Sequence, residues 1–292
     1  MYMKDEALID ELKKRLDDKN KALVDLRSAT KNLEQVNKKL QESEKLKSDF
    51  LSNIRNEINN PLTVMVALSA ELGSMKSCEE KKFKGLAAML HKEALILDFQ
   101  MRNILTAAEL EAGESYLHIT KVNVQSVIDD CVNSFRPFID ENGLKIKRVG
   151  PSPMWANTDS EKLYSILSNI INNAIIFNKE GGLIEITVGE SEGVFTCSIR
   201  DEGIGIAKGD QKVIFDSFKQ LDMGMRKKYR GHGIGLSVVM AAINLLEGSI
   251  SVKSAPDKGS TFTLEIPVRS EEETEGVSTE GMEFFTDDEQ EF

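Results

Sequence analysis

The chain has 292 residues, of which 40% are hydrophobic, and this is enough to build packed cores in about two domains. Its net charge of −11 argues against a nucleic-acid-binding protein, because phosphate contacts require clustered Lys and Arg side chains. Much of the charge belongs to residues 271–292, which carry ten acidic side chains and no basic one. We therefore expect a nearly neutral folded region, followed over residues 270–292 by an acidic disordered tail or linker.

The cysteine pattern and the apolar segments indicate the compartment. Cys78, Cys131 and Cys197 are far apart and form no CxxC pair, which predicts neither a disulfide framework nor a zinc site. No apolar stretch approaches the roughly 20 residues that span a bilayer, and the charged N-terminus does not resemble a signal peptide. We therefore expect a cytoplasmic protein with no membrane segment in this chain.

Residues 5–47 predict one long helix, because they contain no Gly or Pro and are rich in Lys, Glu, Asp and Leu. Their apolar residues follow a 3-4 spacing, the seam of a coiled coil, which Lys19, Thr30 and Asn37 interrupt. We interpret residues 1–45 as a coiled-coil signalling helix; an amphipathic helix packed on its own domain is the alternative. The seam residues are Ile9, Leu12, Leu16, Leu23, Leu26, Leu33 and Leu40.

A helical hairpin is expected over residues 46–114. The apolar spacing continues to about Leu72, with a kink expected at Pro61, and residues 73–77 are typical of a turn. A second helical pattern runs from Phe83 to Ala108 and ends near Gly113. Two antiparallel helices cannot bury such apolar stripes alone, so we expect a homodimer that forms a four-helix bundle.

Residues 115–269 change to short β-branched runs alternating with helical patterns. We expect strands at 118–122, 145–149, 183–188, 195–200, 249–254 and 261–266, and helices at 124–142, 160–177 and 235–247. This order favours an α/β sandwich, in which helices cover one face of a sheet. The expected fold class of the whole chain is therefore α+β.

Three motifs in this region suggest a nucleotide site. Asp201 follows a predicted strand and is followed by Gly203 and Gly205, which permit a tight turn and close approach of a ligand. A second glycine cluster over residues 231–237 opens a helix, whose free N–H groups can cradle phosphate. Asn169 and Asn173 are four residues apart, so they share a helix face on which amide oxygens can hold Mg²⁺.

Taken along the chain, the asparagine pair, the Asp201 motif and the second glycine cluster resemble the N, G1 and G2 boxes, respectively, of the GHKL ATPase superfamily. This superfamily has the Bergerat fold. Residues 214–218 resemble the F box of its histidine-kinase branch, and residues 259–262 resemble the last glycine box. The resemblance implies ATP and Mg²⁺ as cofactors, with Asp201 hydrogen-bonded to the adenine amino group, Asn173 as the Mg²⁺ ligand and Asn169 beside it. The implied nucleotide-binding residues are Asn169, Asn173, Asp201, Gly203, Gly205, Lys228, Tyr229, Arg230, Gly231, His232, Gly233, Gly235 and Leu236.

Residues 219–231 correspond by the same resemblance to the ATP lid, and their basic side chains would lie near the phosphates. A solvated basic loop would have the same composition. The chain departs from the family at Ile176, where a basic residue is usual. This departure predicts reduced phosphate affinity unless Lys179 substitutes.

Residues 50–62 resemble the phosphoacceptor helix of two-component sensor histidine kinases, but Asn56 stands where the family has its histidine. A carboxamide nitrogen is neither a usable nucleophile nor a base that titrates near neutral pH, because its lone pair is delocalised. Glu57 matches the family's general base, and Asn60 matches the position that orients water during dephosphorylation of a receiver domain. None of the three histidines of the chain has this helical setting before a proline; they are His91, His118 and His232.

The resemblance implies a histidine-kinase core that would transfer the γ-phosphoryl group of ATP to a helix histidine and on to a response-regulator aspartate. Its implied partners are a second copy of the chain, a receiver domain and an upstream sensor. With Asn at position 56 we expect no autophosphorylation. Two origins of Asn56 remain open. The chain is either an engineered inactive variant or a natural pseudokinase that acts as a scaffold or response-regulator phosphatase with nucleotide as allosteric ligand. A chaperone-type or mismatch-repair GHKL ATPase is a third reading, but such proteins lack the helical hairpin.

Overall fold

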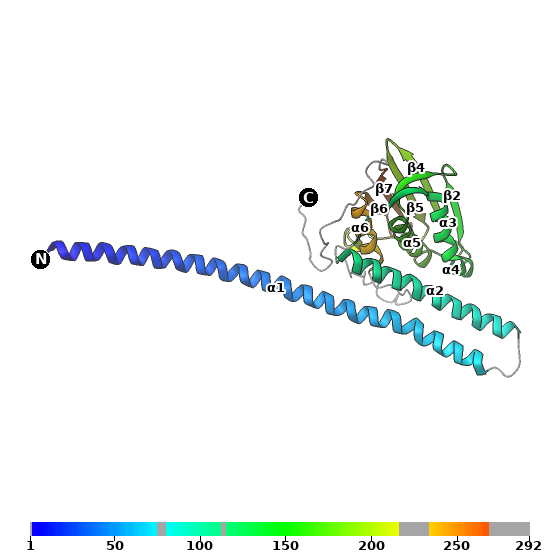
Figure 1. Ribbon diagram of the computed structural model, residues 1–292, viewed down its shortest axis with the longest axis horizontal. Coiled ribbons are helices and arrows are strands. Elements are labelled where there is room, and N and C mark those ends of the chain that lie inside the picture. Colours follow the sequence, from blue (N-terminus) through cyan, green and yellow to red (C-terminus); the bar gives the residue numbers. More distant parts are fainter. Residues whose placement is uncertain (1, 75–79, 112–114, 216–233, 269–292) are drawn as a thin grey trace. The chain divides into compact units, whose positions relative to one another are not determined.

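The computed structural model describes residues 2–74, 80–111, 115–215 and 234–268 (Figure 1). The described residues up to Asp49 belong to one compact unit, and those from Phe50 onward belong to another. The long helix α1 (Tyr2–Ser74) contributes to both units. Mixed helix and sheet make this an α+β chain, as the sequence predicted.

The first unit is the N-terminal part of α1, and the predicted long helix is present there. A single chain leaves its leucine stripe uncovered, because five seam residues are each more than half exposed. They are Leu16 at 60%, Leu23 at 53%, Leu26 at 65%, Leu33 at 69% and Leu40 at 58%. Such exposure fits a helix that needs a second helix to cover the stripe.

The second unit begins with a helical hairpin. Helix α1 continues through the buried Pro61 and ends at Ser74, two residues beyond the expected end, and α2 (Glu80–Glu111) runs back in the opposite direction (Figure 1). An ion pair of 3.0 Å joins Lys82 of α2 to Glu71 of α1. The turn expected at residues 73–77 overlaps the helix at its start, and its remainder lies outside the described residues.

The rest of the second unit contains two sheets. The larger sheet has the strand order β2-β4-β5-β7-β6, with β2 and β4 parallel and the other neighbours antiparallel, and β1 pairs with β3 separately. The strands are β1 (Ile119–Asn123), β2 (Lys145–Val149), β3 (Trp155–Asp159), β4 (Leu183–Ser191), β5 (Val194–Asp201), β6 (Ser249–Ser254) and β7 (Ser260–Pro267). The helices are α3 (Val124–Ser134), α4 (Arg136–Glu141), α5 (Ser160–Ile176) and α6 (Gly235–Leu245), with the 3-10 turn η1 (Val213–Phe215).

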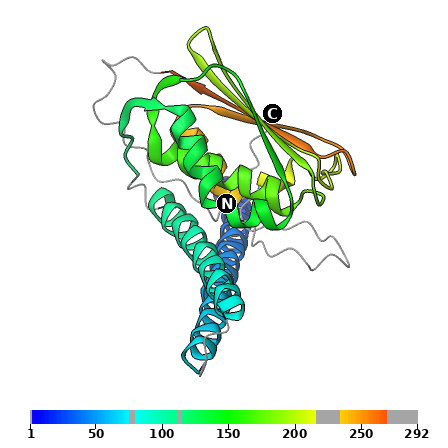
Figure 2. The same ribbon diagram turned by 90° about the vertical axis from the view of Figure 1, so that its right-hand side faces the viewer.

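One face of the larger sheet and the helices enclose the core. Alternate residues of β4 and β5 are buried, and α5 buries most of its length. Figure 2 shows the helices gathered on one side of the sheet, which confirms the predicted sandwich. This arrangement follows from the period of two in the strands, because only one strand face carries a continuous apolar surface.

Two local predictions were wrong. A single helix was expected over residues 124–142, but α3 ends before Phe135 and α4 begins at Arg136. Pro137 explains the break, because it lacks an N–H and fits only the first turn of a new helix. Strand β3 was not predicted; its five residues carry no clear alternation and form a strand by pairing with β1.

Cys131 and Cys197 are free and fully buried. Burial raises the pKa of both thiols, that of Cys197 to about 12, so neither is a reactive thiolate at neutral pH. Cys78 lies outside the described residues. Among the helices that the structure describes, none combines the length and apolar character needed to cross a membrane.

Asp159 joins β3, α5 and the segment that follows the hairpin. Its Oδ1 caps α5 by accepting the backbone N–H groups of Glu161 at 2.9 Å and Lys162 at 3.0 Å. Its Oδ2 accepts the N–H of His118 at 2.7 Å. One buried carboxylate therefore joins the start of α5 to the residue that precedes β1.

We expect Asp159→Ala to lower the free energy of unfolding by about 2–3 kcal/mol, because three backbone donors lose their acceptor. Asp159→Asn keeps one acceptor oxygen for the helix cap and should cost about 1 kcal/mol. Urea denaturation of both variants measures the difference. Equal losses of unfolding free energy in the two variants would contradict the role of Asp159 as the cap of α5.

Candidate nucleotide-binding site

Asp201 is the last residue of β5 and is only 5% exposed. Its Oδ1 accepts two backbone N–H groups, from Gly203 at 2.8 Å and from Ser260 at 3.1 Å. Burial raises the pKa of this carboxyl above its usual value, and the two backbone hydrogen bonds partly offset the effect. Asp201 is therefore a buried acceptor held by backbone donors from two loops.

Glycine is required where the loops around Asp201 meet. A Cβ on Gly203 would lie 2.1 Å from the carbonyl oxygen of Phe177, at the end of α5. A Cβ on Gly205, which has a φ of +67°, would lie 1.9 Å from the carbonyl oxygen of Ala255. A Cβ on Gly259, at φ +77°, would lie 2.1 Å from the carbonyl oxygen of Asp201. The first and last glycine boxes thus pack backbone against backbone at the strand ends.

Two side chains that the sequence analysis missed fix this loop. Ser254 Oγ accepts the N–H of Ile206 at 2.8 Å and donates to the carbonyl of Gly259 at 2.8 Å. Gln211 Nε2 donates to the carbonyls of Ile206 at 3.1 Å and Ser254 at 2.7 Å. Neither residue belongs to a recognisable motif. The hydrogen bonds from Ile206 to Ser254 and from Gln211 to Ser254 join residues more than 40 positions apart, which local sequence does not reveal.

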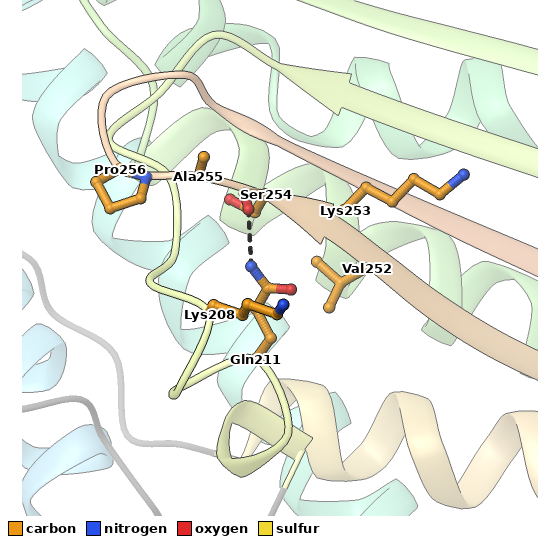
Figure 3. Close-up of a pocket in the computed structure, with 7 residues that line it drawn as sticks. All are labelled: Lys208, Gln211, Val252, Lys253, Ser254, Ala255 and Pro256. Carbon is orange, nitrogen blue, oxygen red and sulfur yellow. Dashed lines mark hydrogen bonds between the residues drawn. The ribbon is translucent and has the colours of Figure 1, made fainter.

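Figure 3 shows Gln211 reaching across to Ser254 in a surface pocket between the loop and the end of β6. The pocket has a volume of about 410 Å³ and is lined by Lys208, Gln211, Val252, Lys253, Ser254, Ala255 and Pro256. It includes none of the predicted nucleotide-binding residues. We therefore treat it as a feature of the sheet edge, separate from the candidate site.

The two predicted asparagines of α5 have different surroundings. Asn173 is half-buried, one helical turn after Asn169. Asn169 is only 2% exposed and exchanges two hydrogen bonds with Asn103 of α2, at 2.7 and 3.0 Å. The sequence analysis did not single out Asn103, because nothing in its local sequence signals a partner 66 positions away.

The helix α6 begins at Gly235, directly after the second glycine cluster. A Cβ on Gly235 would lie 2.6 Å from Oδ1 of Asn169, so this start of α6 packs against the α5 asparagine. Leu236 is half-buried beside it. The remaining predicted residues of the glycine cluster and lid lie outside the described residues: Lys228, Tyr229, Arg230, Gly231, His232 and Gly233.

The described part of the F-box segment packs on the sheet. The ring of Phe215 in η1 meets the ring of Phe262 in β7 edge to face, with centroids 6.4 Å apart. Residues 216–218 of this motif lie outside the described residues. The F-box and the last glycine box are therefore in direct contact.

Lys179, the possible substitute for the missing basic residue at Ile176, has a partner on the protein. Its Nζ forms an ion pair of 3.0 Å with Glu202, although its side chain is 61% exposed. The hydrogen bond from Lys179 and one from the backbone N–H of Leu183 lower the pKa of Glu202. In this arrangement Lys179 points to the loop carboxylate.

The acceptor-type segment lies on α1. Asn56 and Asn60 are exposed, Pro61 is buried, and the side chain of Glu57 lies outside the described part of the chain. His91 is exposed on α2, and His118 is exposed and uses its backbone N–H to donate to Asp159. Neither histidine lies on the helix of Asn56.

Comparison with known proteins agrees with this geometry. Residues 158–270 match the family model for histidine kinase-, DNA gyrase B- and HSP90-like ATPases. The circadian input-output histidine kinase CikA of Thermosynechococcus vestitus is 27% identical over 241 residues, covering 79% of this chain and 32% of the relative. The autoinducer 2 sensor kinase/phosphatase LuxQ of Vibrio vulnificus is 28% identical over 239 residues, covering 80% of this chain and 28% of the relative.

Residues 158–270 thus form a domain of this ATPase family, and the chain as a whole is similar to sensor histidine kinases. Its fold is shared with the full-length structure of ShkA in complex with AMPPNP, with a TM-score of 0.54, 22% identity, and coverage of 79% of this chain and 46% of that one. The chain spans between 15% and 54% of the length of the first curated relatives that it matches.

The glycine contacts around Asp201 predict a position-specific effect. Gly259→Ala should lower the free energy of unfolding by more than about 2 kcal/mol, because the methyl group meets Asp201 backbone and the residue has a left-handed φ. Gly209→Ala is the matched control, since a Cβ there meets nothing within 4 Å. Thermal unfolding measures the stability of the two variants. Equal stability would contradict the close approach of Gly259 to the backbone of Asp201.

The raised pKa of Asp201 predicts a pH dependence. The ionised carboxylate destabilises the fold above its folded-state pKa, and this penalty disappears as the pH falls through that value toward the ordinary 3.8. Asp201→Asn keeps an acceptor oxygen without the charge. We expect the variant to be the more stable protein at neutral pH, by a margin that shrinks on acidification. Urea denaturation across pH tests this, and a constant margin would count against it.

Proposed function

We propose that this chain is the core of a histidine kinase that binds Mg-ATP but cannot phosphorylate itself at position 56. The buried acceptor Asp201, placed between two glycine loops, is the observation that carries the nucleotide part of the proposal. The carboxamide of Asn56 in an acceptor-type segment carries the second part.

Adenine recognition follows from how the Asp201 carboxylate is used. Its Oδ1 already accepts two backbone N–H groups, which fix the orientation of the carboxylate and leave Oδ2 as the acceptor for an exocyclic amino group. The glycines at 203, 205 and 259 keep side chains away from this end of β5. A flat base that carries an amino group fits these requirements, and the AMPPNP complex of the structural neighbour ShkA is consistent with them.

Asn173 is the residue that would hold Mg²⁺, because its half-buried amide lies on the α5 face shared with Asn169. A neutral amide supplies one oxygen ligand, so phosphate oxygens and water would complete the shell of such an ion. The ion would neutralise phosphate charge during transfer. The start of α6 at Gly235 offers backbone N–H groups to the phosphates without a side chain in the way.

Phosphoryl transfer needs a nucleophile that this chain lacks at position 56. In the family reaction the bond from the γ-phosphorus to its bridging oxygen breaks and a phosphorus–nitrogen bond forms on a histidine, whose proton passes to a base. Glu57 occupies the place of that base. Asn56 is exposed on α1, but the lone pair of its carboxamide nitrogen is delocalised into the carbonyl group and cannot act as a nucleophile. We therefore expect no phosphoryl transfer to this side chain.

The proposal includes a homodimer, a cytoplasmic location, and receiver-domain and sensor partners. Support for the dimer comes from apolar side chains that one chain leaves exposed on the hairpin: Leu62 at 44%, Val66 at 63%, Met89 at 55%, Met101 at 46% and Leu105 at 57%. A second hairpin would cover them in a four-helix bundle. Relatives named sensor and hybrid signal transduction kinases are consistent with partners on either side of this core.

A natural pseudokinase with receiver-phosphatase activity is the second candidate. Asn60 is exposed on α1, one turn beyond Asn56, and a relative is named a sensor kinase/phosphatase. An amide at this position would orient a water molecule for attack on an aspartyl phosphate, which needs no histidine. We expect Asn60→Ala to slow the loss of phosphate from a phosphorylated receiver domain by about tenfold or more. Unchanged loss would remove this candidate.

Restoring the histidine tests the main proposal. After incubation with radiolabelled Mg-ATP, we expect label on Asn56→His and none on the unaltered chain. The label should be lost in acid and kept in alkali, as a phosphorus–nitrogen bond requires. Asn59→His is the matched control, because it adds an imidazole to an exposed position of the same helix away from the acceptor place.

Label on the unaltered chain would contradict the proposed block at Asn56. Equal labelling of Asn59→His would show that the position of the imidazole does not matter. Absence of label from Asn56→His, with Mg-ATP binding intact, would favour the pseudokinase candidate.

A further inference from the structure

Helix α2 packs one of its faces on the nucleotide-binding domain. Phe99, Asn103 and Ala107 follow one another at steps of four and therefore share this face. The ring of Phe99 meets Phe135 edge to face, with centroids 5.3 Å apart. Ala107 forms a small buried cluster with Ile234 and Val238, at the start of α6.

Ion pairs flank this apolar contact. Lys92 of α2 pairs with Glu141, the last residue of α4, and its ammonium also lies 5.2 Å from the ring centroid of Phe138. Glu109, near the other end of α2, lies 3.8 Å from the buried Lys162 of α5. The hairpin therefore contacts the α5 and α6 side of the domain along several turns of α2.

A reciprocal amide pair lies inside this otherwise apolar contact. Asn103 Nδ2 donates to Asn169 Oδ1 at 3.0 Å, and Asn169 Nδ2 donates to Asn103 Oδ1 at 2.7 Å. A second hydrogen of Asn169 Nδ2 is donated to the backbone carbonyl of Ser165 at 2.9 Å. Both N–H groups of Asn169 are thus in use, and the carbonyl of Ser165 fixes which end of the amide is nitrogen.

Asn169 also touches the phosphate side of the domain. Its Oδ1 occupies the space that a Cβ on Gly235 would take, at 2.6 Å, where α6 begins. One buried amide therefore contacts the hairpin on one side and the start of the phosphate-binding helix on the other. Asn173, the proposed Mg²⁺ ligand, lies one turn further along α5.

A buried amide pair is suited to reversible docking. It adds little net stability compared with apolar packing, but it strongly disfavours any register in which only one amide is paired. The contact is therefore specific in position and modest in strength. Such a contact can be opened by a ligand that competes for one of its two partners.

We propose that Asn103 is a latch residue that holds Asn169 in the docked arrangement, so that Mg-ATP binding and docking of α2 compete. To donate to a bound nucleotide, Asn169 must release Asn103, because neither of its N–H groups is spare. The apparent affinity for Mg-ATP is therefore the intrinsic affinity multiplied by the fraction of molecules that are not latched. By reciprocity, Mg-ATP loosens α2 from the domain to the same extent. This inference rests on the proposed nucleotide-binding function.

The test measures Mg-ATP affinity by calorimetry on the full chain and on Asn103→Ala. Loss of the pair removes two hydrogen bonds from the docked state only, so we expect about three- to tenfold tighter binding. Asp98→Asn is the matched control, because Asp98 is exposed on α2 and pairs only with Arg102 of the same helix in the described contacts. Its affinity should equal that of the unaltered chain.

Amide hydrogen exchange supplies a readout independent of affinity. Without nucleotide, Asn103→Ala should exchange faster than the unaltered chain over residues 99–110 and over α5. Mg-ATP should produce the same acceleration over residues 99–110 in the unaltered chain. Asn103→Leu is a second variant of similar size, in case the alanine variant does not fold; its side chain neither donates to nor accepts from Asn169, so the same changes are expected.

Equal or weaker Mg-ATP binding by both Asn103 variants would overturn the latch, since weaker binding would mean that the pair organises the site. Slower exchange of residues 99–110 with Mg-ATP would overturn it as well. If the unaltered chain binds no Mg-ATP, the proposed function fails. In that case unchanged exchange in the Asn103 variants would separately exclude Asn103 as the residue that holds α2 on α5.

Discussion

The carboxylate of Asp201 is the interaction on which the nucleotide side of this molecule depends. One oxygen accepts a donor from the loop that follows β5 and another from the start of β7, so the two glycine loops are joined through a single atom. Glycine is needed at 203, 205 and 259 because each of these loops meets another backbone there. The cost is a buried charge, which the raised pKa of Asp201 reflects.

The proposed function assigns different tasks to the helical hairpin and to the α/β-sandwich domain. In the proposed function the domain supplies the carboxylate of Asp201, the amide of Asn173 and the start of α6, which would bind and orient the nucleotide without forming covalent bonds. In the proposed function the covalent step would belong to the hairpin, where Asn56 stands at the position of the acceptor imidazole. On this proposal a single side chain separates nucleotide binding from phosphoryl transfer. The amide pair of Asn103 and Asn169 is a direct contact between the hairpin and the domain.

The sequence predicted the parts of the fold that arise from local periodicity. The long helix, the hairpin and six strands follow from apolar spacing, and β2 and β6 were predicted with their observed bounds. The break at Phe135 was missed because a proline two residues later ends one helix and also starts another. Strand β3 was missed because its pairing with β1 is a tertiary effect.

In the candidate site too, residues in local motifs were predicted and residues that act through tertiary contacts were not. Asp201, Asn169 and the glycines were predicted because their spacing forms motifs, and the structure brings Asp201, Gly203 and Gly259 into contact at the end of β5. Asn103, Gln211 and Ser254 were not predicted. Their roles consist of hydrogen bonds to residues distant in sequence, which composition and periodicity do not report.

Calorimetric titration of the unaltered chain with Mg-ATP and with Mg-GTP tests the central claim most directly. In the proposed site Asp201 would offer an acceptor to the base. An acceptor suits the amino group of adenine and repels the carbonyl oxygen that guanine carries at the same position. We predict one Mg-ATP bound per chain and at least about tenfold weaker binding of Mg-GTP. No binding of Mg-ATP, or equal binding of the two nucleotides, would contradict the account.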